Sequence, residues 1–213
     1  IIAGERCLEG ASPTARVYLR SGNQAGSCTG TLIAPNVVVT AAHCVEKADA
    51  LQIWINRIQR TVSSAVYHPN YEPDPRVSPT TEDHDVALIF LTSPVIGITP
   101  AKVYFGNEFS LNETAIIGGY GIDTKAKSDI LRAGRMFLFK VTDGAIYSSF
   151  AGRESNTCSG DSGGPLYVFR DGDWKIAGAT SGGTSENCSN PDLSSFVRFG
   201  GSNQAFLNSY GIF

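Results

Sequence analysis

Short apolar runs separated by turn residues make up most of this chain. The runs are rich in β-branched and aromatic residues and end at Gly, Pro, Asn, Asp or Ser, which is typical of strands joined by turns. Strands are predicted at Val17–Leu19, Thr29–Ile33, Val37–Thr40, Leu51–Ile55, Val86–Leu91, Ala115–Gly118, Met136–Val141, Pro165–Phe169, Lys175–Thr180 and Phe196–Phe199. The pattern therefore predicts an all-β protein, although periodicity does not distinguish packed barrels from a sandwich.

Apolar residues are spaced as on one face of a helix in only a few places along the chain. Phe206, Leu207 and Tyr210 would share one face of a helix. This spacing predicts a short C-terminal helix at about 202–210. A second short helical turn is expected after His43.

Composition supports a turn-rich β protein. The chain has 213 residues, with 23 glycines, 10 prolines and 17% charged residues, and all-β proteins of this length often form one unit. A net charge of -3 gives no reason to expect a nucleic-acid partner. No apolar run is long enough to span a membrane. The chain begins without Met and without a signal-like segment, which indicates a processed N-terminus.

Three short motifs carry the candidate chemistry. They are Thr40–Cys44 around His43, Asp85–Leu88, and Gly160–Pro165 around Ser162. Together they supply an imidazole, a carboxylate and a hydroxyl, the groups of a base-activated serine nucleophile. The glycines beside Ser162 allow a tight turn and a close approach of substrate. The same turn would aim the amides of Gly160 and Ser162 at one point, as an oxyanion hole requires.

With the start Ile1-Ile2-Ala3-Gly4, these motifs resemble the chymotrypsin/trypsin-like serine endopeptidases from residue 1 to about residue 199. The resemblance implies two packed six-stranded antiparallel β-barrels in a single peptidase domain of residues 1–213. The barrels would cover about 1–105 and 106–200, followed by the terminal helix. It makes His43 the general base, Asp85 its orienting partner and Ser162 the nucleophile that forms an acyl-enzyme. Ser181 is expected to reach Asp85, whereas Asp83 is expected to be solvated.

The resemblance also implies activation by cleavage of a precursor. The released amine of Ile1 would insert and pair with Asp161, because a buried ammonium needs a partner. This pairing would order the substrate pocket and the oxyanion hole, so Ile1 and Asp161 are expected to act as one switch of a zymogen.

The substrate pocket departs from the best-known relatives. By resemblance its base is Asn156, where trypsin-like enzymes carry an aspartate, followed by Thr157, and its wall is Ser181, Gly182 and Gly183. A neutral base argues against a standard preference for Lys or Arg at the residue before the cleaved bond. Two alternatives stay open at this stage, since either Asp192 or Glu186 would restore a basic preference on reaching the pocket.

The five cysteines indicate the cellular compartment in which the protein acts. Family resemblance pairs Cys28 with Cys44 and Cys158 with Cys188, which indicates an oxidising compartment and a secreted or periplasmic enzyme. Cys7 is left over. It is either a free thiol, the former partner of a removed pro-segment, or a buried residue that acts as a small hydrophobe.

The other two histidines, His68 and His84, and two loops carry further expectations. His68 is expected in a surface turn, and His84 is expected to be a loop histidine. The proline-containing stretch Tyr71–His84 is expected to form an exposed loop over the substrate groove. The segment Asn56–Ala65 is shorter than the calcium-binding loop of relatives and lacks its carboxylates, so no metal is expected there.

The sequence therefore predicts a monomeric serine endopeptidase that acts on protein or peptide substrates, needs no cofactor and is open to protein protease inhibitors. Neither a nucleic-acid nor a membrane partner is expected. Two alternatives are an inactive homologue that serves as a binding module and an esterase with the same acyl-transfer chemistry.

Overall fold

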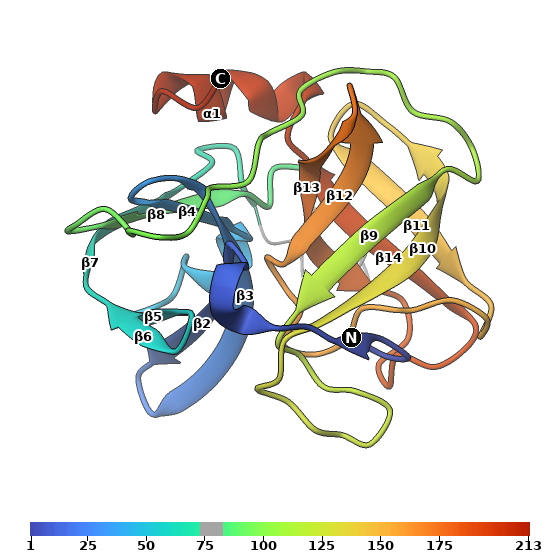
Figure 1. The fold of residues 1–213 in the computed structure, drawn as a ribbon, viewed down its shortest axis with the longest axis horizontal. Helices are drawn as coiled ribbons and strands as arrows, with labels where there is room; N and C mark the ends of the chain where they lie inside the picture. Colours follow the sequence, from blue (N-terminus) through green and yellow to red (C-terminus); the bar gives the residue numbers. More distant parts are fainter. Residues whose placement is uncertain (73–82) are drawn as a thin grey trace.

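Two antiparallel β-sheets lie side by side in the computed structural model, which describes residues 1–72 and 83–213. The connection from the first sheet to the second runs from residue 91 to residue 114 along the outside of the molecule (Figure 1). The predicted exposed loop Tyr71–His84 falls mostly on residues 73–82, which lie outside the described residues. None of the described helices is long and apolar enough to cross a membrane.

The C-terminal sheet contains a closed barrel. Its strands, in spatial order, are β1 (Glu5–Arg6), β10 (Arg132–Val141), β11 (Ala145–Phe150), β14 (Asp192–Arg198), β13 (Asp173–Gly183), β12 (Pro165–Arg170) and β9 (Thr114–Gly119). Because β9 also pairs with β10, the six strands from β9 to β14 form a closed ring. Apolar side chains that alternate along these strands fill its interior, with Phe196 and Ile117 fully buried.

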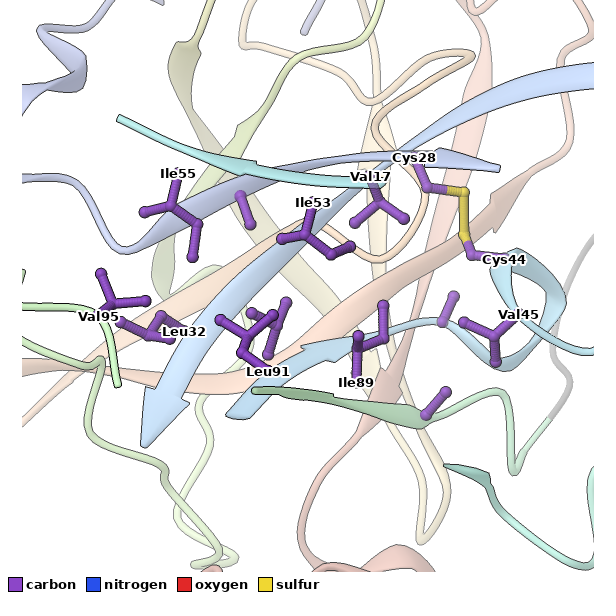
Figure 2. Packing of buried hydrophobic residues seen from close by; sticks show 14 of the residues in the cluster. Val17, Cys28, Leu32, Cys44, Val45, Ile53, Ile55, Ile89, Leu91 and Val95 are labelled. Carbon is purple, nitrogen blue, oxygen red and sulfur yellow. A yellow bond between two sulfur atoms is a disulfide. The ribbon is translucent and has the colours of Figure 1, made fainter. Parts of the chain in front are cut away.

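The N-terminal sheet curls without a pairing that closes it among the described residues. Its strands, in spatial order, are β6 (Ile58–Arg60), β5 (Ala50–Ile55), β2 (Thr14–Ser21), β3 (Gln24–Ala34), β4 (Val37–Thr40), β8 (Ala87–Leu91) and β7 (Val62–Tyr67). Its concave face encloses a core that includes Leu32, Ile53 and Ile89 and ends at the Cys28–Cys44 disulfide (Figure 2). The chymotrypsin-like, nearly all-β fold predicted from the sequence is confirmed, with one closed barrel and one curled sheet.

A third core lies where the two sheets meet. Val39 and Leu88 from the N-terminal sheet pack in one cluster with Val197 and Phe199 from the C-terminal end of the chain. The predicted helix is present as α1 (Gln204–Ser209), which buries Phe206 and Leu207 in this cluster. Short 3₁₀ turns occupy η1 (Glu9–Ala11), η2 (Ala42–Cys44) and η3 (Gly201–Asn203). The short helical turn expected after His43 is η2, which contains His43 itself.

The N-terminus of the chain lies beside the C-terminal sheet and not beside the N-terminal sheet (Figure 1). Strand β1 pairs with β10, with Glu5 opposite Ala133. As a result the Ile1 side chain is buried in the core of the closed barrel, next to Ile117 and Phe196. The first residues of the chain therefore stabilise the part of the fold that carries Ser162.

The predicted strands all appear, and four more accompany them. The additional strands are β1, β6, β7 and β11. Strand β7 lies at the edge of its sheet and exposes Ser63, Ser64 and Ala65. Its sequence therefore lacks the run of buried apolar residues that predicts a strand. Strand β11 buries a polar residue, Ser148, whose hydroxyl donates to the Phe137 carbonyl. Buried serine interrupts the alternation that marks a half-buried strand.

Candidate active site

The junction of the two sheets brings the three motifs together. Asp85 lies two residues before β8 in a fully buried position, while His43 lies on η2 with 32% of its side chain exposed. The Asp85 Oδ2 atom is 2.8 Å from His43 Nδ1, and Asp85 Oδ1 accepts the His43 backbone N–H at 2.9 Å. Since a carboxylate only accepts, Nδ1 carries the proton and Nε2 is the basic nitrogen.

Ser181 holds the same carboxylate from the other side. Its hydroxyl donates to Asp85 Oδ2 at 2.6 Å, as expected from the sequence. Asp83, by contrast, is exposed, and its backbone carbonyl accepts a hydrogen bond from the side-chain amide of Asn203. The buried Asp85 charge therefore has three donors, which a buried carboxylate needs.

The Ser162 loop docks on the strand that carries Cys28. Thr29 N–H donates to the Ser162 carbonyl at 2.8 Å, and the Thr29 hydroxyl donates to the Gly160 carbonyl at 2.8 Å. The sulfur of Cys44, the neighbour of His43, is 3.8 Å from the Ser162 carbonyl oxygen. Thr29 thus positions the loop, a role that sequence reasoning missed because a threonine within a strand carries no distinctive signal.

The backbone around Ser162 needs glycine. Gly160 and Gly163 have φ values of 90° and 77°, which residues with a Cβ rarely adopt. A Cβ on Gly163 would lie 2.0 Å from Thr40 Oγ1. In the part of the chain that the structure describes, the N–H groups of Gly160 and Ser162 donate to no protein acceptor. Two free amides in one tight turn are suited to an oxyanion.

Ile1 and Asp161 form a fully buried ion pair. The Ile1 ammonium lies 2.9 Å from Asp161 Oδ2 and donates to the Ile122 carbonyl at 3.1 Å. Asp161 also accepts the N–H groups of Gly121 and Cys158. Burial raises the pKa of the Asp161 carboxyl, whereas the Ile1 ammonium and these two amides act in the opposite direction. The predicted activation pair is thus present as a contact one residue away from Ser162.

The residues expected at the base of the substrate pocket are joined by hydrogen bonds in a buried network. The Asn156 amide nitrogen donates to Asp192 Oδ2 at 2.7 Å and to the Cys188 carbonyl at 3.3 Å. Its amide oxygen accepts the Ser194 hydroxyl at 2.7 Å, and Ser194 Oγ lies 2.9 Å from Thr157 Oγ1. The Asn156 side chain is fully buried, so its hydrogen-bonding capacity is used within the protein.

Asp192 is the one acidic residue of this network. Its side chain is buried, and Oδ1 accepts N–H groups from Thr184, Ser185 and Leu193 and the hydroxyl of Thr184. Of the two alternatives left open by the sequence, Asp192 therefore contacts Asn156, whereas Glu186 is exposed. The wall residues Ser181, Gly182 and Gly183 lie at the end of β13, next to this network.

Both expected disulfides are present. Cys28–Cys44 joins β3 to η2, and Cys158–Cys188 joins the Ser162 loop to the loop before β14. Cys7 is unpaired among the described residues and partly exposed, and burial raises the pKa of its thiol. Among these residues, the one group close enough to share a metal ion is Cys28, His43 and Cys44, whose sulfurs are used in the disulfide.

The expectation of a surface turn at His68 is wrong. His68 is buried, its ring stacks on the His84 ring at a centroid distance of 4.2 Å, and it also contacts Phe206 of α1. His68 Nδ1 accepts the Asn70 N–H, so this nitrogen carries no proton. His84 lies in the turn before Asp85, as expected, with Nδ1 2.9 Å from Asn203 Oδ1. Packing against α1, which lies more than 100 residues later, could not be inferred from the local sequence.

This histidine pair should make the protein sensitive to acid. Burial, with a smaller contribution from His84, lowers the pKa of His68 to about 4, below the unfolded value of about 6.5. The neutral ring is then favoured in the folded state. Its contribution to stability is present above about pH 6.5 and is lost as the pH falls toward 4. The loss should reach roughly 3 kcal/mol.

The measurement is urea unfolding of wild type and His68→Phe between pH 7 and 4. We expect the free energy of unfolding to fall less steeply with decreasing pH in the variant. Equal slopes in the two proteins would contradict the assignment.

This geometry is that of a chymotrypsin-like serine endopeptidase. The chain matches the Trypsin family over residues 1–200 and belongs to that family, whose members are serine endopeptidases that act on protein or peptide substrates. It is 31% identical to a trypsin of Simulium vittatum over 73% of this chain and 70% of that protein. It is 29% identical to mouse kallikrein 1-related peptidase b27 over 90% of this chain and 82% of that protein.

Other comparisons concern length and fold. The chain spans 48% of the length of rat vitamin K-dependent protein C, to which it is 24% identical. The solved structure of HL collagenase superimposes over the whole of both chains with a TM-score of 0.84 at 22% identity. Mouse neuropsin gives a TM-score of 0.79, also at 22% identity, over 99% of this chain and 100% of that chain. These structural likenesses show the fold.

Proposed function

We propose that the chain hydrolyses peptide bonds through Ser162, His43 and Asp85. The observation that carries this proposal is the pair of hydrogen bonds that the His43 ring and backbone N–H groups donate to Asp85, beside the loop of Ser162. These contacts fix both the tautomer and the orientation of the imidazole, which the base of such a triad requires.

The mechanism follows from these positions. Ser162 Oγ attacks the carbonyl carbon while His43 Nε2 takes its proton, and the amides of Gly160 and Ser162 stabilise the oxyanion. The C–N bond breaks as His43 returns the proton to the leaving amine, and an acyl-enzyme remains. Water then attacks this ester, His43 removes the water proton, and Ser162 regains its hydrogen as the acid departs. Asp85 stays ionised and stabilises the imidazolium.

Labelling with a fluorophosphonate tests the proposed nucleophile. We expect one adduct, on Ser162 by mass spectrometry, formed in parallel with the loss of peptide hydrolysis. An unlabelled protein would favour a role as a binding module. Turnover of matched peptide and ester substrates separates an endopeptidase from an esterase, because only the former cleaves the amide efficiently.

We also propose that the enzyme is secreted and is activated by N-terminal processing. Trypsin-like proteases are typically secreted, and two disulfides are suited to an oxidising compartment. The buried pair of the Ile1 amine with Asp161 supports the activation step, because that amine exists only when Ile1 is the first residue.

The pocket network supports a preference for uncharged residues before the cleaved bond. Asp192 accepts five hydrogen bonds from neutral donors of the protein, four at Oδ1 and one, from the Asn156 amide, at Oδ2. Because these donors already stabilise the carboxylate, it is a weaker ion-pair partner for a substrate ammonium or guanidinium than a carboxylate without them would be. A buried cation that lacks a strong partner is costly.

A peptide-library cleavage profile checks this preference. We expect kcat/KM to be at least about tenfold higher for uncharged residues than for Lys or Arg, which corresponds to about 1.4 kcal/mol. Asp192→Asn should leave that ranking unchanged. A wild-type profile dominated by Lys or Arg, and lost in Asp192→Asn, would show that the charge of Asp192 acts on the substrate.

A further inference from the structure

A cavity of about 580 Å³ lies beside the N-terminal strand β1, away from the residues assigned to catalysis. Strand β1, strand β10 and the segment 153–155 line it. Its volume is within the range of about 300–1,000 Å³ that is usual for ligand sites.

Three arginines line this cavity: Arg6, Arg135 and Arg153. All three are exposed, and none forms an ion pair within the part of the chain that the structure describes. Among the other described arginines, four pair with carboxylates, namely Arg16, Arg57, Arg132 and Arg170, whereas Arg20, Arg60 and Arg198 do not. A protein with a net charge of -3 thus gathers unpaired cations around one hollow.

The wall of the cavity at Ser155 is tightly packed. Ser155 is buried, its hydroxyl donates to the Ala3 carbonyl at 3.1 Å, and its N–H donates to the Arg135 carbonyl at 2.9 Å. A Cβ on Gly134 would lie 2.2 Å from Ser155 Oγ and 3.2 Å from Ile1. The wall is therefore well packed, so the cavity is present before any ligand binds.

We propose that this cavity binds an acidic peptide segment in an extended conformation. Strand β1 is at the edge of its sheet, and an edge strand offers backbone groups to an added chain. The three guanidiniums match carboxylates, and the exposed Phe137 ring offers an apolar contact.

The cavity should select among acidic ligands. Glu5 and Glu154 also line it, and their charges oppose a uniformly anionic polymer. They favour a chain whose carboxylates are separated by neutral residues. Since alternate side chains of an extended strand share one face, a segment that alternates acidic and neutral residues fits best.

The test is fluorescence anisotropy with a labelled, capped hexapeptide that alternates threonine and glutamate. The protein carries Ser162→Ala so that the peptide is not cut, and the readout does not depend on catalysis. We expect binding at least about tenfold tighter than that of the same peptide with glutamine in place of glutamate, and weaker binding at high salt.

Charge reversal locates the site. The triple variant Arg6→Glu, Arg135→Glu, Arg153→Glu should bind the acidic peptide at least tenfold more weakly. A control triple variant with the same charge change elsewhere, Arg20→Glu, Lys47→Glu, Lys125→Glu, should bind nearly as wild type does. The milder Arg→Gln triple variant, which should lower affinity about fivefold, replaces the first variant if that protein fails to fold.

Several outcomes would overturn the proposal. They are equal binding of the glutamine peptide, wild-type affinity in the Arg6, Arg135, Arg153 variant, and an equal loss in both charge-reversed proteins. Binding of a sulfated oligosaccharide through the same arginines, without binding of the acidic peptide, would show that the site takes another class of ligand.

Discussion

Replacing Ser162 with alanine is expected to lower kcat for peptide hydrolysis by about four to six orders of magnitude, as loss of a triad member does in other serine proteases. The reason is that the proposed mechanism forms its acyl-enzyme on the Ser162 hydroxyl, which alanine lacks. The fold should persist, because the Ser162 loop is held through backbone atoms, with the Ser162 carbonyl accepting the Thr29 N–H. Steady-state kinetics with a fluorogenic peptide, together with thermal unfolding, measures both.

Two further variants sharpen this result. His43→Ala should cause a loss of similar size, since the three groups act as a unit. Ser159→Ala, in the same loop but with an exposed side chain, should keep its activity and its fluorophosphonate labelling. Wild-type rates in folded Ser162→Ala or His43→Ala would show that the catalytic assignment is wrong.

Adding two residues before Ile1 is expected to lower kcat/KM by roughly 10²- to 10³-fold, the effect of leaving a buried charge unpaired. Ile1 is fully buried, and its ammonium contacts Asp161 and Ile122 directly. An extended chain would remove the charged amine and would have no room to enter. Asp161, adjacent to Ser162, would lose its cation, and the turn that carries the oxyanion amides would lose its support.

The measurement compares the extended protein before and after specific removal of the extension, which should restore activity. The same two residues added after Phe213, which is exposed, provide the matched control and should have little effect. Asp161→Asn should reproduce the loss without any extension. Full activity of the N-terminally extended protein would show that the free amine is not the switch.

The sequence alone determined the fold class, the family and the candidate catalytic residues. Runs such as Val37–Thr40 and Lys175–Thr180 predict strands because each is a short, mostly apolar run bounded by turn residues, as in a strand buried on both faces. The motif around Ser162 is equally local, since its tight turn requires glycine. The donors to the Asp85 carboxylate, by contrast, come from His43 and Ser181, 42 and 96 residues away. The catalytic roles themselves stay a prediction until the variants are measured.

Only the tertiary structure decided which distant groups meet. His68 was wrongly expected at the surface, because the ring that covers it, Phe206, comes from the C-terminal helix. The contact of Asp192 with Asn156, 36 residues apart in the chain, depends on how the Cys188 loop folds back. The arginines of the β1 cavity come from three separate segments. Burial and long-range hydrogen bonds depend on how distant segments pack together, so a local pattern of residues does not predict them.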